Sequence, residues 1–202
     1  ITGTALMSRG LQSLGAHVIA YIPDRATEGH GLTKDAVDFF TEKGVSLLIT
    51  VDCGTTDVIE ITYGKTAGID IIVTDHHLPT SEVGIPFALI NPQLESSSYP
   101  FPNLSGVGLA FKLIQGLYQH IGVEWDVNLL QLAAIGTIAD LVPLLGENRY
   151  LVAEGLRRMN TDPLPGLIEL INNGRLNQSG SLDASSISFG IGPRINAPGR
   201  LD

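Results

Sequence analysis

One aliphatic run that ends in charged side chains constrains the fold of this chain more than any other feature. Residues 71–79 read Ile-Ile-Val-Thr-Asp-His-His-Leu-Pro, so a short β-branched segment is followed by a carboxylate and two imidazoles. Such a run is typical of a strand buried in a parallel sheet, and open α/β sheets bind ligands at the carboxyl ends of their strands. Adjacent strand residues point to opposite faces, so His76 and His77 are expected to have different roles. We therefore expect Asp75, His76 and His77 at a functional edge of the sheet.

A second segment, residues 45–51, repeats this pattern and ends in Asp52, followed closely by Gly54. Parallel strands that end in Asp52 and in Asp75-His76-His77 would place oxygen and imidazole ligands at one edge of the sheet. This mixture of ligands suits Mn²⁺, Mg²⁺ or Zn²⁺. Alternatively, each aspartate only caps the helix that follows it, as Asp often does. Capping explains either aspartate alone, whereas their equivalent positions on two strands favour a metal site.

Strand-like and helical segments alternate along the first part of the chain. The predicted strands are residues 17–23, 45–51, 71–77 and 87–90. The predicted helices are residues 2–14, 32–43, 57–67, 104–121, 127–145, 149–159 and 164–172. Short connections imply right-handed crossovers, and hence an α/β fold with a parallel β-sheet flanked by helices, followed by an all-helical C-terminal segment. We expect an α/β core that carries the site over residues 1–145, and a helical extension with a Gly- and Pro-rich tail over residues 146–202.

The composition excludes several classes of protein. A chain of 202 residues with 44% hydrophobic and 16% charged residues fits one large domain, or a domain with a small appendage, rather than disorder. No apolar run is long enough to span a bilayer, and the single cysteine, Cys53, cannot form an internal disulfide. A net charge of −9 argues against a large basic groove for duplex DNA. It does not exclude a nucleic-acid substrate, because carboxylates that hold cations contribute to that charge.

Several blocks of the sequence, in order, resemble the DHH phosphoesterase superfamily and, within it, the bacterial exonucleases specific for single-stranded DNA. The matching blocks are residues 22–32, 51–54, 75–77, 105–113, 136–144 and 192–200. The resemblance implies metal-dependent phosphodiester hydrolysis with Mn²⁺ or Mg²⁺, and 5′-to-3′ digestion of single-stranded DNA in repair and recombination. It also implies a bacterial cytoplasmic protein, with a single-strand-binding protein and a RecQ-type helicase as partners.

The same resemblance suggests a role for each residue at the expected edge. Asp52 would bridge two metal ions, His76 and Asp140 would ligate one of them, and Asp75 and His77 would support the site, with His77 near the phosphate. Two neighbouring cations can activate a water and stabilise both the attacking and the leaving oxygen. Alternatively, Asp140 is a helix cap, but it lies at an apolar helix end where an unpaired carboxylate would be costly. A partner for Asp140 is therefore required.

Two residues of the loop that follows the first predicted strand are candidates for contacts to the nucleic acid. Arg25 can make bidentate contacts to a phosphate, and by the resemblance it would help to hold the 5′ end of the strand. His30 stands where the resemblance leads us to expect a tyrosine that stacks on a base, and histidine can also stack. Alternatively, Arg25 pairs with Asp24 or Glu28 at the surface.

Two further segments are candidates for binding the phosphate backbone. Ser105, Gly106 and Gly108 open a predicted helix and could offer backbone N–H groups to an anion, although close packing is the commoner reason for glycine there. Arg194 and Arg200 lie in a stretch too rich in glycine and proline for a core helix. They are candidates for gripping the backbone of the nucleic acid, or for salt bridges that hold the tail on the domain.

The resemblance also predicts parts that these 202 residues lack. The family's first strand ends in Asp-x-Asp directly before the residues that match Ile1 onward, and it would complete a two-metal site. The chain therefore resembles an excised piece that is inactive alone, without a C-terminal domain and a nucleic-acid-binding β-barrel. Two alternatives are a family member that acts on small substrates (an oligoribonuclease, nucleotide phosphatase or pyrophosphatase) and a non-catalytic replication scaffold. The presence of the acidic and histidine residues argues against the scaffold.

Overall fold

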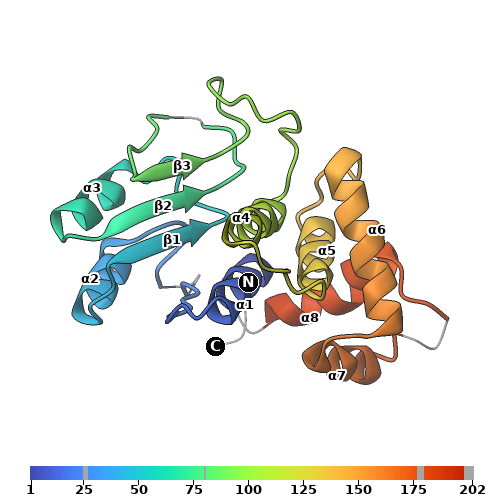
Figure 1. Cartoon of the computed structure of the whole chain (residues 1–202). Helices are drawn as coiled ribbons and strands as arrows, with labels where there is room; N and C mark the ends of the chain where they lie inside the picture. Colours follow the sequence, from blue (N-terminus) through green and yellow to red (C-terminus); the bar gives the residue numbers. More distant parts are fainter. Residues whose placement is uncertain (25–26, 80, 177–179, 198–202) are drawn as a thin grey trace.

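Three parallel strands form a sheet whose carboxyl ends all face one edge. The computed structural model describes residues 1–24, 27–79, 81–176 and 180–197. The strands β1 (Leu47–Val51), β2 (Asp70–Thr74) and β3 (Ala88–Ile90) lie in the order β1-β2-β3. In Figure 1 the arrowheads of β1 and β2 point toward helix α4. The predicted fold, an α/β domain with a parallel sheet, is confirmed.

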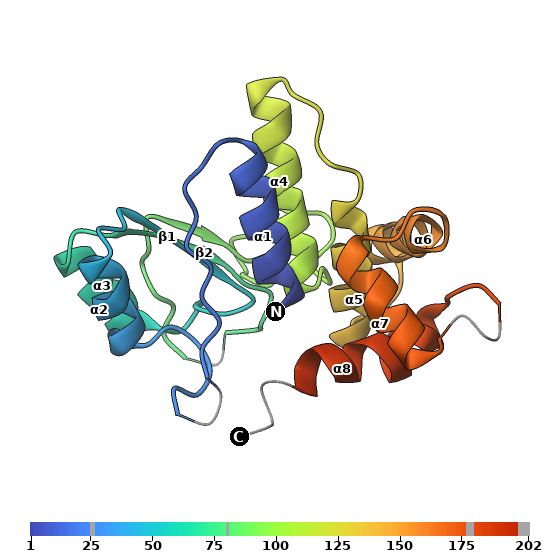
Figure 2. The same ribbon diagram turned by 90° about the horizontal axis from the view of Figure 1, so that it is seen from below.

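Two helices cover one face of this sheet, as Figures 1 and 2 both show. They are α2 (Lys34–Glu42) and α3 (Val58–Thr66). The side chain of Thr33 begins α2 by accepting a hydrogen bond from the N–H of Ala36. The apolar core between these helices and the sheet contains Ala36, Val37, Phe40, Leu48, Ile61, Ile69, Ile71 and Val73. This packing keeps the strands in place beneath the functional edge.

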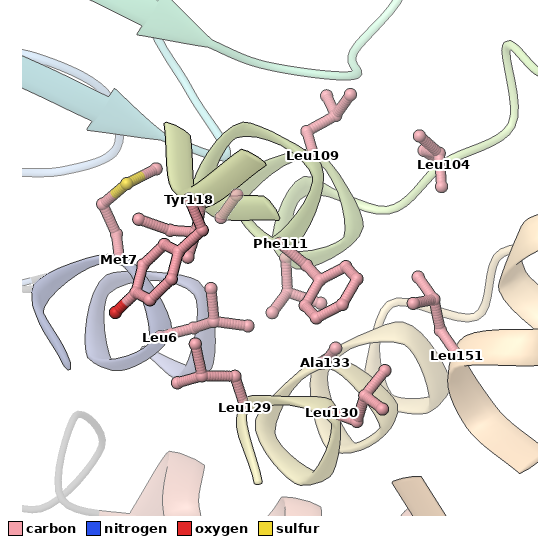
Figure 3. Packing of buried hydrophobic residues seen from close by; sticks show 13 residues of the cluster. Leu6, Met7, Leu104, Leu109, Phe111, Tyr118, Leu129, Leu130, Ala133 and Leu151 are labelled. Carbon is pink, nitrogen blue, oxygen red and sulfur yellow. The ribbon is translucent and has the colours of Figure 1, made fainter. Parts of the chain in front are cut away.

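The opposite face of the sheet packs against a layer of helices. These are α1 (Thr2–Ser13), α4 (Gly106–Ile121) and, beyond them, α5 (Leu129–Ala139). Figure 3 shows Phe111 extending from α4 toward Ala133 and Leu130 of α5, with Leu6 of α1 beside them. All four side chains are buried. This core holds the start of α4 close to the end of α5.

The remaining helices pack on the outer side of α5. They are α6 (Gly146–Thr161), α7 (Pro165–Gly174), the π-helix η1 (Ser186–Ile191) and α8 (Gly192–Asn196). The predicted domain boundary at residue 145 falls in the loop between α5 and α6, which pack against each other. None of the helices in the described residues is long and apolar enough to cross a membrane.

Two predicted elements differ from the structure near the functional edge. Residues 17–23 are not a strand. Among the described residues β1 pairs only with β2, so no backbone hydrogen-bond ladder joins β1 to residues 17–23. Instead, residues 16–21 line a groove along the free edge of β1. The helix predicted over residues 127–145 ends at Ala139, because Asp140 caps it and Leu141 turns away with a φ of +60°.

The Gly- and Pro-rich tail, predicted to be too rich in these residues for a core helix, is helical over its described part. Ile187 and Ile191 of η1 are buried in an apolar cluster that also contains Ile135 of α5 and Val152 of α6. Pro193 lies in the first turn of α8, where a missing backbone N–H costs nothing. The prediction was wrong because burial of two isoleucines outweighs the low helix propensity of the glycines.

Candidate metal centre

Asp52 leaves the end of β1 in a backbone conformation that few residues adopt. Its φ is +68°, in the left-handed region that Asp tolerates better than most side chains. Its N–H donates a hydrogen bond of 2.8 Å to Thr74 O, which ties the turn to β2. Gly54 follows with a φ of +111°, and a Cβ there would come within 2.8 Å of Thr50 Oγ1. This tight turn holds the Asp52 carboxylate at the edge of the sheet.

Asp75 organises the turn that follows β2. Its side chain is buried, and Oδ1 accepts hydrogen bonds from the N–H of His76 at 2.8 Å, the N–H of His77 at 3.2 Å and Nδ1 of His77 at 2.7 Å. Its Oδ2 accepts from the N–H of Thr55 at 3.0 Å. Burial raises the pKa of Asp75, but hydrogen bonds from Thr55 and His77 lower it by more, so its pKa lies below the usual value. Asp75 is therefore an ionised acceptor that fixes both histidines.

His76 is the point at which the predicted ligands converge. Its Nε2 lies 3.0 Å from Asp52 Oδ1 and 3.3 Å from Asp140 Oδ2. Burial lowers the pKa of His76, whereas the carboxylates of Asp52 and Asp140 raise it by more, and the net shift is upward. The side chains of Asp52, His76 and Asp140 thus meet, although these residues are far apart in the sequence. All three are predicted to ligate metal.

Asp140 reaches this point from the end of α5, opposite the sheet. Burial raises the pKa of Asp140 and so does the nearby Asp52 carboxylate, while His76 and the backbone N–H of Gly106 lower it, with a net upward shift. Gly106 is the first residue of α4, so the positive end of that helix faces the two carboxylates. A Cβ on Gly106 would lie 2.2 Å from Asp52 Oδ1. The carboxylates can therefore crowd together only because α4 begins with glycine.

The donor atoms fit a divalent cation. Asp52 Oδ1 and His76 Nε2 are both shielded from solvent, and within the described residues neither makes a hydrogen bond of acceptable geometry. Ligand atoms of Asp52, His76 and His77 all lie within 4.8 Å of one another. Two ligands at right angles on an ion with bonds of roughly 2.1 Å would be about 3.0 Å apart. Carboxylate and imidazole together suit Mn²⁺, Mg²⁺ or Zn²⁺.

A cavity of about 300 Å³ opens onto the two carboxylates that His76 contacts. Asp52 and Asp140 line it, together with Thr2 at the start of α1 and Asn196 at the end of α8. The starts of α1 and α4 and the end of β1 therefore meet around one space. It can admit a phosphate group and part of a sugar.

Of Arg25, His30 and Arg200, all predicted to contact the nucleic acid, only His30 can be placed. His30 lines the cavity, and its ring centre lies 6.2 Å from that of His77, with the two planes nearly perpendicular. This position is compatible with the predicted contact to a base. Arg25 and Arg200 lie outside the described residues.

The predicted anion site at the start of α4 requires correction. Ser105 is fully buried, and its hydroxyl accepts a hydrogen bond from the N–H of Gly108 and bonds to Thr137. Gly108 is buried against Leu104 and Leu151. Neither residue faces the cavity, so both serve to cap and pack α4. Gly106 does line the cavity, as Asp140 does, and its backbone N–H lowers the pKa of that carboxylate.

Arg194 is held by the backbone of its own segment. Its guanidinium donates a hydrogen bond of 2.7 Å to Gly190 O and lies against Gly174. From the same segment, Ile195 and Asn196 line the cavity. Arg194 is not among the described residues that line the cavity, and its contact with phosphate stays a prediction.

Sequence reasoning missed three polar residues around the site. Thr55 and Asn91 are buried and hydrogen-bond the loop that carries the histidines, and Asn196 borders the cavity. Asn91 directly follows β3, so the strand-end pattern that identified Asp52 and Asp75 could have found it. Thr55 and Asn196 carry no comparable signal, because their positions depend on the turn after β1 and on an unpredicted helix.

Comparison with known proteins identifies proteins that are similar to this chain. A family model described as the N-terminal domain of the DHH family matches residues 1–137, about two thirds of the chain. The chain belongs to the DHH family. Asp75, His76 and His77 are the residues that spell this name, and they occupy the turn at the centre of the site.

Among DHH proteins, this chain is similar to single-stranded-DNA-specific exonucleases. The exonuclease RecJ of Bacillus subtilis is 43% identical over 204 residues, which cover all of this chain and 25% of the relative. A crystal structure of exonuclease RecJ bound to manganese matches with a TM-score of 0.87 at 38% identity, covering 99% of this chain and 50% of that one. RecJ of Thermus thermophilus in complex with Mg²⁺ matches with a TM-score of 0.67 at 33% identity, covering 99% and 24%. The chain thus spans about a quarter of the length of its B. subtilis relative.

Proposed function

We propose that this chain is the catalytic core of a cation-dependent exonuclease that degrades single-stranded DNA from its 5′ end in DNA repair and recombination. The observation that carries the proposal is the convergence of Asp52, His76 and Asp140 at one place, where the two carboxylates line a cavity. The similar proteins named as exonucleases specific for single-stranded DNA support the substrate class. The same proposal includes a cytoplasmic location and, as partners, a single-strand-binding protein and a RecQ-type helicase.

Different residues of the chain would have different roles in such a site. Asp52, His76 and Asp140 would hold Mn²⁺ or Mg²⁺, as the manganese- and magnesium-bound relatives suggest. When bound, such cations activate a water and offset the charge that develops on a phosphate. His77, whose Nδ1 is engaged by Asp75, presents its other ring nitrogen for a contact with a phosphate oxygen.

The expected Asp-x-Asp strand would supply the ligands that this set does not. Mg²⁺ takes near-octahedral coordination, so three side chains leave positions for water, substrate or further carboxylates. Ile1 lines the cavity beside Asp52, so residues preceding it in a longer protein would approach the ion. The groove of about 420 Å³ between residues 16–21 and the free edge of β1 offers space for a strand.

Release of nucleotides from a 5′-phosphorylated single strand by the full-length natural protein tests the proposal. We expect release that depends on Mn²⁺ and is lost in Asp52→Ala and in His76→Ala, by more than the roughly 10–100-fold that supporting residues typically contribute. Asp70→Ala is the matched control, because Asp70 lies exposed at the far end of β2. Unchanged activity in Asp52→Ala would contradict the proposal. Faster turnover of dinucleotides than of long strands would indicate a hydrolase of small substrates.

A further inference from the structure

A buried asparagine at the end of β3 reaches across to the turn that carries the histidines. Asn91 is only 4% exposed, and its Nδ2 donates one hydrogen bond of 2.9 Å to Thr55 Oγ1 and another of 2.9 Å to His77 O. Its Oδ1 accepts from the N–H of Gln93 at 2.8 Å. Because a backbone N–H needs an oxygen as its acceptor, this bond fixes which way the amide faces. Both amide hydrogens are therefore directed at the site.

Thr55 extends this chain of hydrogen bonds to the carboxylate. It is 2% exposed, and its hydroxyl oxygen accepts the hydrogen bond from Asn91 Nδ2. The backbone N–H of the same residue donates to Asp75 Oδ2 at 3.0 Å. Asp75 in turn accepts from Nδ1 of His77. Hydrogen bonds thus link Asn91 to the side chain of Thr55, the backbone of Thr55 to Asp75, and Asp75 to the imidazole of His77.

We propose that Asn91 is a positioning residue, which sets the orientation of His77 through two arms: a direct bond to the His77 carbonyl and a relay through Thr55 and Asp75. This inference rests on the proposed exonuclease function for its kinetic consequences. Neither Asn91 nor His77 is among the described residues that line the cavity, but the His77 side chain is exposed and its ring lies beside that of His30, which does line it. The buried Asn91 would therefore act on substrate only through His77. The three strands of the sheet thereby each contribute to the site: β1 ends in Asp52, β2 in the histidines, and β3 in the residue that holds them.

The change Asn91→Asp tests the donor function with almost no change in shape. The variant keeps the acceptor for Gln93 but presents an oxygen where Nδ2 stood. Thr55 would then lose the donor to its hydroxyl oxygen, and the His77 carbonyl would face a carboxylate with no hydrogen between them. The expected result is a fall of about 10–100-fold in kcat for nucleotide release, with KM for the single strand within about twofold of wild type.

Gln131→Glu is the matched control for this substitution. Gln131 is a fully buried amide in α5 that also donates to a backbone carbonyl, that of Asp162, and accepts from a backbone N–H, that of Leu164. The same change of amide to acid should lower thermal stability there while leaving kcat of the folded fraction at the wild-type value. Equal kcat in the folded Asn91→Asp and Gln131→Glu variants would overturn the positioning role.

Two further measurements keep the inference independent of activity and of folding. Thr55→Ser retains the hydroxyl and should keep wild-type kcat, whereas Thr55→Val should reproduce the loss seen in Asn91→Asp. In the metal-free protein with ¹⁵N-labelled histidine, the Nδ1–H signal of His77 should be protected from exchange and should lose that protection in Asn91→Asp. If the wild-type protein releases no nucleotides, the proposed function fails while this signal still decides the role of Asn91. Unaltered protection in the variant would contradict the role.

Discussion

At the scale of single residues, the site is governed by an imidazole placed between two carboxylates. Without a cation, a protonated His76 is the positive charge that Asp52 and Asp140 face, which is why its pKa rises despite burial. A folded-state pKa above 6.5 means that the proton stabilises the metal-free fold at low pH, and that this contribution is lost as the pH rises through the raised value. A divalent cation can replace His76 as the positive charge between these carboxylates only when that proton leaves.

Competition between the proton and the ion leads to a pH dependence. We expect Mn²⁺ affinity, measured by calorimetry, to rise by up to tenfold per pH unit below the raised pKa of His76 and to level off above it. His17→Gln is the control, because His17 lies exposed outside the site and its loss should leave the profile unchanged. An affinity that does not vary between about pH 5.5 and 8 would exclude His76 as a ligand.

At the scale of elements, the start of α4 does more than begin a helix. Its first residue allows Asp52 to approach, and its positive end faces the carboxylates of Asp52 and Asp140. Both effects depend on the missing side chain of Gly106. The helix is therefore part of the metal centre, although it contributes no ligand atom from a side chain.

Replacing Gly106 by alanine tests this role within one helix. The new Cβ would lie 2.2 Å from Asp52 Oδ1 and displace that carboxylate, so we expect Mn²⁺ affinity to fall about tenfold or more. Gly116→Ala, in the same helix with open space around it, should raise the free energy of unfolding by up to about 1 kcal/mol without altering affinity. Equal Mn²⁺ affinity in the two variants would show that α4 does not shape the site.

Elements also show how far the sequence alone can be interpreted. The convergence of Asp52, His76 and Asp140 could be predicted because the ends of parallel strands meet at one edge and because a family resemblance linked them to α5. Residues 17–23 were misassigned, since a short continuous apolar run predicts extended backbone but cannot supply a neighbouring strand. Residues 186–196 were misassigned because tertiary burial, absent from local propensity, makes them helical.

At the scale of the whole molecule, the site lies where the sheet meets the helical layers. Asp52 and His76 come from the sheet, while Asp140 comes from α5, so their spacing depends on how the two parts are joined. The fully buried Asn148 of α6 donates hydrogen bonds to Asn103 O at 2.6 Å and Pro143 O at 3.0 Å. It thereby fixes the loop after Asp140 to the segment that leads into α4.

Removal of this link should affect the distant metal centre. Asn148→Ala removes two hydrogen bonds, each worth roughly 0.5–1.5 kcal/mol, so we expect a loss of roughly 1–3 kcal/mol in unfolding free energy and weaker Mn²⁺ binding. Asn160→Ala removes a similar bridge, between Leu156 O and Leu182 O, on the far side of α6. This control change should lower the free energy of unfolding without altering Mn²⁺ affinity. Wild-type Mn²⁺ affinity in Asn148→Ala would show that the two parts are held in register by other contacts.

The position of a bound ion is the most direct test of the whole account. Anomalous X-ray diffraction from crystals of the natural protein containing Mn²⁺ would locate it without reference to activity. We predict a manganese peak in the cavity, at roughly 2.0–2.3 Å from Asp52 Oδ1, His76 Nε2 and Asp140 Oδ2. A manganese ion bound elsewhere, with these three side chains unligated, would contradict the central claim.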